Sequence, residues 1–127
     1  SPTKSTVYLE KFKKYSNFGK YILEDFFKYQ PKKKFDLVFS YGAIEHFSNQ
    51  KKRQKATSVH KNLSRKYAAI FVPKDSFLVR NFFHYPEEKG YEKLYKKEEL
   101  EKKLKIAGLR PIKFGRNLQP FGFLCRV

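Results

Sequence analysis

The chain has 127 residues, of which 40% are hydrophobic and 18% aromatic, a composition that excludes intrinsic disorder. The length fits a single domain covering residues 1–127, and no apolar run approaches the roughly 20 residues that span a bilayer, so no membrane partner is expected. With 29 Lys and Arg against 12 Asp and Glu, the formal net charge is +17, and such a charge attracts nucleic acid and other polyanions.

The kind of basic residue offers another explanation of the charge. Most basic residues are Lys and they accompany many Phe and Tyr, a bias that an A/T-rich coding sequence produces without selection for binding. Charge alone therefore makes nucleic acid a candidate partner, with codon bias as the competing explanation. The single cysteine, Cys125, leaves no internal disulfide and no cysteine metal cluster, and makes the cytoplasm the default location.

The first predicted elements are a helix and a turn. Ser1 and Pro2 suit the N-cap and first position of a helix over residues 1–16, and aromatic residues follow it at helical spacing. Residues 17–20 predict a turn in which Gly19 supplies a left-handed cap. The chain contains no Met and opens directly on a helix cap. We therefore expect a domain that is truncated at its N-terminus.

The next predicted element is a strand over residues 21–27, before a basic loop over residues 30–34. Asp25 lies near the end of this strand, where an acid suits the ligand edge of a sheet better than a strand interior. The plain alternative is a turn acid without a ligand. Phe26 and Phe27 follow it directly and would supply an apolar wall.

The central predicted strand covers residues 35–39 and is apolar enough to be buried on both faces of a parallel sheet. Ser40, Tyr41 and Gly42 interrupt it, and the pair Glu45 and His46 follows at once. Ligands of parallel sheets bind beyond the carboxyl ends of the strands, which is where these residues would lie. The alternative is a buried strand, a turn and a helix start with the acid and imidazole simply solvated.

The second half of the chain predicts two helices and three strands. A basic helix over residues 49–63 buries Ala56, Val59, His60 and Leu63, and we expect His60 to be a packing histidine. A strand over residues 66–73 precedes an aromatic-rich stretch, residues 75–95, which is either a substrate lid or an insert packed on the core. A helix over residues 96–107 ends at Gly108, and residues 109–114 and 121–127 form a hairpin.

These segments together resemble a known family. F-D-L-V-F-S-Y-G-A-I-E-H-F at residues 35–47 resembles the fourth-strand motif of class I S-adenosylmethionine-dependent methyltransferases. Residues 21–27, 67–73 and 94–109 are similar to the preceding strand, the following strand and a C-terminal helix of that family. The resemblance covers nearly the whole chain and implies an α/β fold. This fold is a Rossmann-like, mostly parallel sheet with flanking helices and a C-terminal antiparallel hairpin, truncated at the N-terminus.

The resemblance also implies a cofactor, S-adenosylmethionine, and roles for particular residues. It assigns Asp25 to the adenine amine, with Phe26 and Phe27 against the base. Contacts to the cofactor would come from Ser40, Tyr41 and Gly42. At the reacting centre His46 would be a general base, and Glu45 would orient it or bind a polar substrate group.

The sequence departs from the family in two ways. No G-x-G occurs in the chain, so the glycine-rich cradle for the methionine tail is absent. The ribose-binding acid, which in the family ends the second strand, is also absent. Gly42 stands where some members carry the first acid of an E-x-x-E-H metal motif, so no metal is expected. We expect the chain alone to bind S-adenosylmethionine weakly or not at all. A non-catalytic module that binds nucleic acid or protein on a degenerate methyltransferase scaffold is the alternative function, and the methyl acceptor is not encoded in any readable motif.

Overall fold

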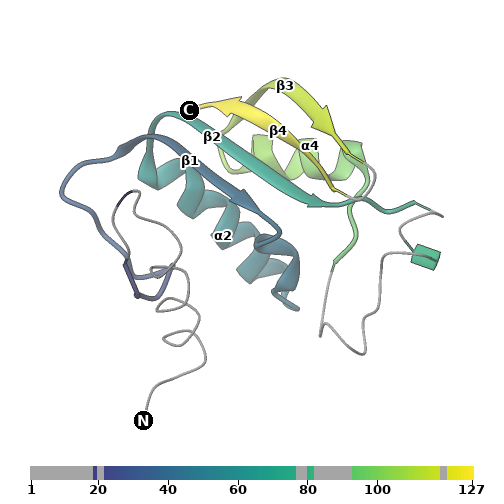
Figure 1. Cartoon of the computed structure of the whole chain (residues 1–127), viewed down its shortest axis with the longest axis horizontal. Coiled ribbons are helices and arrows are strands. Elements are labelled where there is room, and N and C mark those ends of the chain that lie inside the picture. Colours follow the sequence, from purple (N-terminus) through teal and green to yellow (C-terminus); the bar gives the residue numbers. More distant parts are fainter. Residues whose placement is uncertain (1–18, 20–21, 77–79, 82–92, 118–119) are drawn as a thin grey trace, which may run out of the picture.

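A computed structural model describes residues 19, 22–76, 80–81, 93–117 and 120–127. In these residues the elements follow one another as β1 (Phe35–Tyr41), η1 (Ile44–His46), α2 (Gln50–Leu63), β2 (Ser64–Pro73), α4 (Lys97–Ile106), β3 (Arg110–Arg116) and β4 (Pro120–Arg126). The strands form one sheet in the order β1-β2-β4-β3, with α2 packed against β1 and β2, and α4 against β3 and β4 (Figure 1).

The sheet is mixed. β1 and β2 are parallel, and α2 is the crossover between them. β4 pairs antiparallel with both β2 and β3, so the chain ends in a hairpin whose second strand lies in the middle of the sheet. The predicted α/β class with flanking helices and a C-terminal antiparallel hairpin is confirmed. Among the described strands, β1 and β2 form the parallel pair.

Most predicted boundaries agree with the structure to within two residues. The Asn49 side chain accepts hydrogen bonds from the backbone N–H groups of Lys51 and Lys52, at 2.7 and 3.3 Å, and so caps α2. Gly108 has a φ of +86° directly after α4, as expected of a helix C-cap. β1 runs on through Ser40 and Tyr41, beyond the strand end that the sequence predicts, and β2 begins at Ser64.

The strand predicted over residues 21–27 is wrong for the part that the structure describes. Ile22 to Phe27 contain no strand, and a turn begins at Phe26. Asp25 makes this turn: its carboxylate accepts from the Phe27 N–H at 2.9 Å, and its carbonyl accepts from the N–H groups of Lys28 and Tyr29. An Asp that accepts a hydrogen bond from its own following backbone favours a turn over a strand ladder, even when Phe26 and Phe27 come next.

Some predictions lie outside the described residues. These are the helix over residues 1–16, the turn over residues 17–20 apart from Gly19, and most of the aromatic stretch between residues 75 and 95. Of the aromatic residues in that stretch, the structure describes Tyr95. It is buried in the core and its backbone bridges to Lys74, beside the end of β2.

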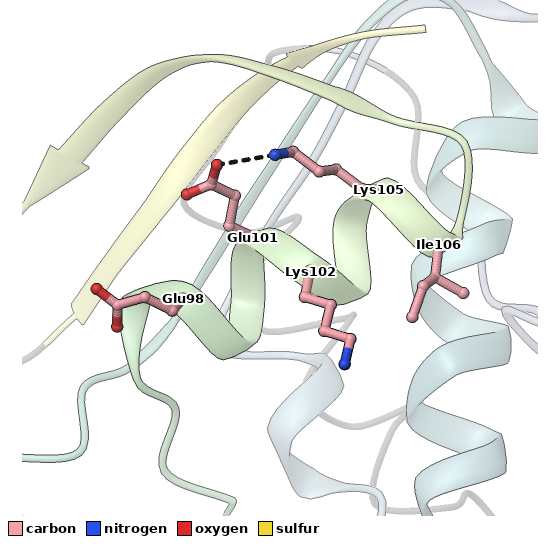
Figure 2. A pocket seen from close by; sticks show the side chains of 5 residues that line it. All are labelled: Glu98, Glu101, Lys102, Lys105 and Ile106. Atoms are coloured by element: carbon pink, nitrogen blue, oxygen red, sulfur yellow. Dashed lines mark ion pairs between the residues drawn. The ribbon is translucent and has the colours of Figure 1, made fainter.

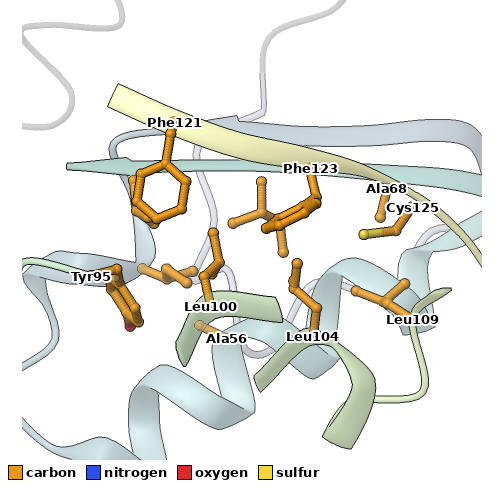
Figure 3. Close-up of a cluster of buried hydrophobic side chains, with 12 residues drawn as sticks. Ala56, Ala68, Tyr95, Leu100, Leu104, Leu109, Phe121, Phe123 and Cys125 are labelled. Carbon is orange, nitrogen blue, oxygen red and sulfur yellow. The ribbon is translucent and has the colours of Figure 1, made fainter. Parts of the chain in front are cut away.

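One face of the sheet carries the hydrophobic core (Figure 3). Alternate residues of β2 point to this face, because successive side chains of a strand point to opposite sides. Figure 3 shows side chains from the strands above meeting those from α2 and α4 below. The buried set is Ile44, Ala56, Ala68, Ile70, Val72, Tyr95, Leu100, Leu104, Leu109, Phe121, Phe123 and Cys125.

The other face of β1 is open. Phe35, Leu37, Phe39 and Tyr41 alternate along the strand and are all exposed, Phe39 by 68% and Tyr41 by 64%. The prediction that this strand is buried on both faces is therefore wrong. The reason is that α2 and α4 both pack on the opposite face, and that β1 has a paired neighbour, β2, on one side within the described part of the chain.

Candidate functional site at the carboxyl end of strand β1

The candidate site begins where β1 ends. Gly42 follows Tyr41 with a φ of +76°, a backbone conformation that favours glycine. Its N–H donates to the carbonyl of Phe71 on β2 at 3.0 Å, which ties the turn to the sheet. A Cβ at this position would lie 3.2 Å from Glu45 Oε1. The turn therefore needs glycine both for its backbone and for the space beside Glu45.

Glu45 and His46 lie in η1, immediately after this turn. Glu45 is 1% exposed, whereas the His46 side chain is 47% exposed, with Nε2 3.5 Å from Glu45 Oε1. The Glu45 carbonyl also accepts from the N–H of Lys93 at 2.8 Å, which fixes the backbone of η1. A buried carboxylate thus stands beside a solvent-accessible imidazole. Such a pair can hold the ring in one orientation.

Ser40 is joined to α2 through His60. His60 is 1% exposed, with Nδ1 2.7 Å from the Ala56 carbonyl and Nε2 2.8 Å from Ser40 Oγ. A carbonyl can only accept, so Nδ1 carries the proton. Burial lowers the pKa of His60 and favours the neutral ring. The Nε2 lone pair then accepts from the Ser40 hydroxyl, which leaves the lone pairs of Oγ for another donor.

This bond gives the predicted packing histidine a second role. His60 is indeed buried in the core face of α2, but it also fixes the rotamer of Ser40. The two residues are 20 positions apart in sequence. The helical spacing of residues 49–63 places His60 on the buried face of α2, but no sequence pattern pairs it with Ser40.

Two of the residues assigned to adenine pack against this site. The Phe26 ring meets His60 edge to face, with centroids 5.5 Å apart, and Phe27 lies 5.2 Å from the ring of Phe47, the residue after His46. Phe26 and Phe27 therefore lie on the core side of the turn made by Asp25. Asp25 is exposed, and its Oδ1 is engaged by the Phe27 N–H.

The structure thus brings most of the predicted site residues together at one end of β1. Ser40, Tyr41 and Gly42 are consecutive, and Glu45 and His46 follow in η1. The Phe26 ring packs on His60, which is hydrogen-bonded to Ser40. Among the described residues, no group of three or more His, Cys, Asp or Glu is arranged to hold a metal ion. In the same residues no helix has the length and apolar character needed to cross a membrane.

A separate hollow of about 540 Å³ lies on the outer side of α4 (Figure 2). Its lining comes from one helix, and Lys105 Nζ lies 3.2 Å from Glu101 Oε1 across it. The lining residues are Glu98, Glu101, Lys102, Lys105 and Ile106. It contains none of the predicted site residues, and a surface formed by one helix with paired charges offers no converging chemistry.

Several solved methyltransferases share this fold. An S-adenosylmethionine-dependent methyltransferase from Clostridium acetobutylicum matches with a TM-score of 0.72 and 13% identity, over 98% of this chain and 72% of its own. The magnesium protoporphyrin IX methyltransferase of Synechocystis, solved with bound S-adenosylhomocysteine, matches with a TM-score of 0.68 and 11% identity, over 92% of this chain and 55% of its own. The N-methyltransferase NodS of Bradyrhizobium japonicum matches with a TM-score of 0.64 and 11% identity, over 98% and 62% respectively.

These matches show the fold: the chain has the α/β architecture of solved methyltransferases across nearly its whole length. It spans between about half and three quarters of the length of the three. No family model matches the sequence, and no curated protein is significantly similar to it.

Proposed function

We propose that the chain is the C-terminal two-thirds of a class I methyltransferase that transfers a methyl group from S-adenosylmethionine to an acceptor of unidentified class. The observation that carries the proposal is the turn at Gly42 with Glu45 and His46 behind it. This turn stands at the carboxyl end of a parallel strand, in a fold that solved methyltransferases share. Ligands of such sheets bind at this edge.

The residues at this edge fit part of the cofactor. Gly42 offers a backbone without a side chain, and Ser40 offers an oriented hydroxyl oxygen as an acceptor. Tyr41 lies between them, while Phe26 and Phe27 would face the adenine ring with Asp25 at its amine. When bound, the cofactor supplies the electrophilic methyl carbon.

We assign the protein's own chemistry to His46 and Glu45. In this proposal His46, the more exposed of the two, takes a proton from the acceptor as the methyl group is transferred. Glu45 holds the imidazole in place from its buried position. A general base of this kind contributes about 10²–10⁴-fold to a rate.

The proposal includes a missing part. The chain has no G-x-G, which in this family precedes the first helix and cradles the methionine tail. Among the described strands β1 has one neighbour, β2, and its Phe39 and Tyr41 are exposed; both facts support a further segment that would cover them. The lone Cys125 is consistent with a reducing compartment, and we propose the cytoplasm.

The test is a titration of the 127-residue chain with S-adenosylhomocysteine, followed by backbone amide shifts in two-dimensional NMR. We expect shifts that cluster at residues 40–46 and 26–27, with millimolar affinity because the glycine cradle is absent. Nicotinamide mononucleotide, a nucleotide without adenine, is the control ligand and should not produce this pattern.

Two results would count against different parts of the proposal. Shifts that cluster elsewhere on the chain, with none at residues 40–46, would place the ligand at another site and remove the methyltransferase assignment. Micromolar binding at those residues would keep the assignment and overturn the claim that a further segment is needed.

A further inference from the structure

The surface before β1 and along α2 is strongly basic. Residues 28–66 contain 11 Lys and Arg but two acids, Asp36 and Glu45. Asp36 pairs with Arg65, whose Nε lies 2.8 Å from Asp36 Oδ1, and Glu45 is buried. The acids of this segment therefore leave most of its positive charge uncompensated. On α4, by contrast, three Glu lie among four Lys, and Lys105 pairs with Glu101.

Two adjoining hollows cross this basic surface, and Lys34 lines both. The first, of about 300 Å³, lies between the loop before β1 and the C-terminal end of α2. The second, of about 660 Å³, lies beside the start of β1. We call the two together the lysine groove; its polar and aromatic lining includes Tyr29, Gln30, Lys33, Lys34, Asn62 and Arg65.

Aromatic rings in the groove are held in place by their neighbours. The ring of Tyr29 stacks on Phe35 with centroids 6.4 Å apart and an interplanar angle of 19°. The Lys55 ammonium lies 5.2 Å from the centre of the Phe27 ring, which also lines the first hollow. Rings that are already ordered lose little entropy when a base stacks on them.

We propose that the lysine groove binds single-stranded nucleic acid. Lys33 and Lys34 would contact phosphates, Tyr29 would stack on a base, and the amide of Gln30 would meet a base edge. Arg65, which lines the same hollow, is paired with Asp36. Cations that follow a backbone beside stacking rings are the recurring design of single-strand binding sites. The groove lies at the amino end of β1, whereas the Ser40–His46 site lies at its carboxyl end. Phe27 borders the groove and is also assigned to the adenine ring, but the contacts proposed for Lys33, Lys34 and Tyr29 do not depend on the methyltransferase proposal.

The test measures binding of fluorescein-labelled 12-mers of oligo(U) and oligo(dT) to the whole chain by fluorescence anisotropy at several KCl concentrations. Wild type is compared with Lys33→Ala/Lys34→Ala and with the control pair Lys102→Ala/Lys105→Ala on α4, which removes the same charge elsewhere. For the groove pair we expect weaker binding and a salt dependence, log Kd against log [KCl], that is shallower by about 1.4. The α4 pair should stay close to wild type.

A second variant tests stacking rather than charge. Tyr29→Leu should weaken binding about five- to a hundredfold without changing the salt slope, whereas Tyr29→Phe should bind like wild type. Circular dichroism checks that each variant is folded. If Tyr29→Leu does not fold, the comparison of Lys33→Ala/Lys34→Ala with Lys102→Ala/Lys105→Ala still decides the proposal.

Three outcomes would overturn the proposal. Equal weakening by the groove pair and the α4 pair would mean diffuse attraction by the net charge. Wild-type affinity in the folded Tyr29→Leu variant would remove the stacking site. Binding to vesicles with 30% phosphatidylserine, with no binding to either 12-mer, would assign the groove to a membrane surface instead.

Discussion

Single residues at the end of β1 hold the candidate site in shape, and Gly42 is the most constrained of them. Its positive φ is uncommon for other residues, and the space beside it is taken by the Glu45 carboxylate. His60 has the complementary task on the core side, where it holds the Ser40 hydroxyl. Each of these residues can be tested alone.

Gly42→Ala should destabilise the chain by about 1–2 kcal/mol from the left-handed backbone alone, with a further cost because the new Cβ would lie 3.2 Å from Glu45 Oε1. Urea unfolding measures the loss. Gly19→Ala is a matched control, because Gly19 has the same φ of +76° and, among the described residues, no atom within 4 Å of where its new Cβ would lie. Equal losses in the two variants would mean that the Glu45 contact is irrelevant.

His60 should make stability depend on pH. Burial lowers its pKa in the folded chain from 6.5, so the unfolded chain binds a proton first as the pH falls. The contribution of neutral His60 is therefore fully present above pH 6.5 and is lost as the pH falls through the folded pKa. Urea midpoints at about pH 7.5 and about pH 5.0, on either side of the unfolded pKa, should differ more for wild type than for His60→Gln. An identical pH dependence in the two proteins would contradict the buried neutral imidazole.

At the scale of elements, the helices differ in how they begin. Asn49 caps α2 with hydrogen bonds to two backbone N–H groups, whereas Lys96, the N-cap of α4, makes no such side-chain bond. α2 is also the crossover between the parallel strands, so its start lies next to the candidate site. The cap therefore supports both the helix and the turn before it.

Asn49→Ala should destabilise the chain by about 1 kcal/mol because two N–H groups at the helix start lose their acceptor. Lys96→Ala, the same substitution at the N-cap position of α4, should lower the stability of the chain by less than about 0.5 kcal/mol. Thermal unfolding of the two variants side by side checks the difference. If both shift the midpoint equally, the side chain of Asn49 is not the cap that it resembles.

Sequence patterns predicted the elements whose signals are local. The bounds of α2 and β2 were predicted to within two residues. The signals were the cap and helical spacing of residues 49–63 and the apolar run before Pro73. The strand over residues 21–27 failed because Asp25 bonds to its own loop, an effect that outweighs the strand preference of Phe26 and Phe27. The Ser40–His60 bond joins residues 20 positions apart, and no local pattern encodes such a contact.

At the scale of the whole molecule, the helices lie on one face of the sheet and β1 leaves the other face open. A continuous apolar run looks the same in sequence whether one or both of its faces are covered. This is why the run predicts a buried Phe39, whereas that ring is the most exposed of the large hydrophobic side chains on the strand. The fold class was predictable from the order of the segments, but the coverage of the sheet was not.

Phe39→Ser/Tyr41→Ser should therefore change the stability of this chain by less than about 1 kcal/mol. Because exposed apolar rings on a strand favour association between copies, the variant should also scatter less light than wild type at high concentration. Phe123→Ser, a buried ring on the covered face, should cost about 3–5 kcal/mol. Urea unfolding and light scattering provide the two readouts. A large loss of stability in the first variant would mean that the outer face is already covered in solution.

The reactivity of Cys125 can report on the opening of strand β4. It lies on β4 between β2 and β3, fully buried, and desolvation raises the pKa of its thiol to about 12. The folded protein should therefore be almost inert to iodoacetamide at about pH 8, and alkylation should proceed through transient unfolding. The labelling rate, followed by mass spectrometry with increasing urea, should then rise with the unfolded population. Rapid labelling without urea would show that the hairpin separates from β2 while the rest of the chain stays folded.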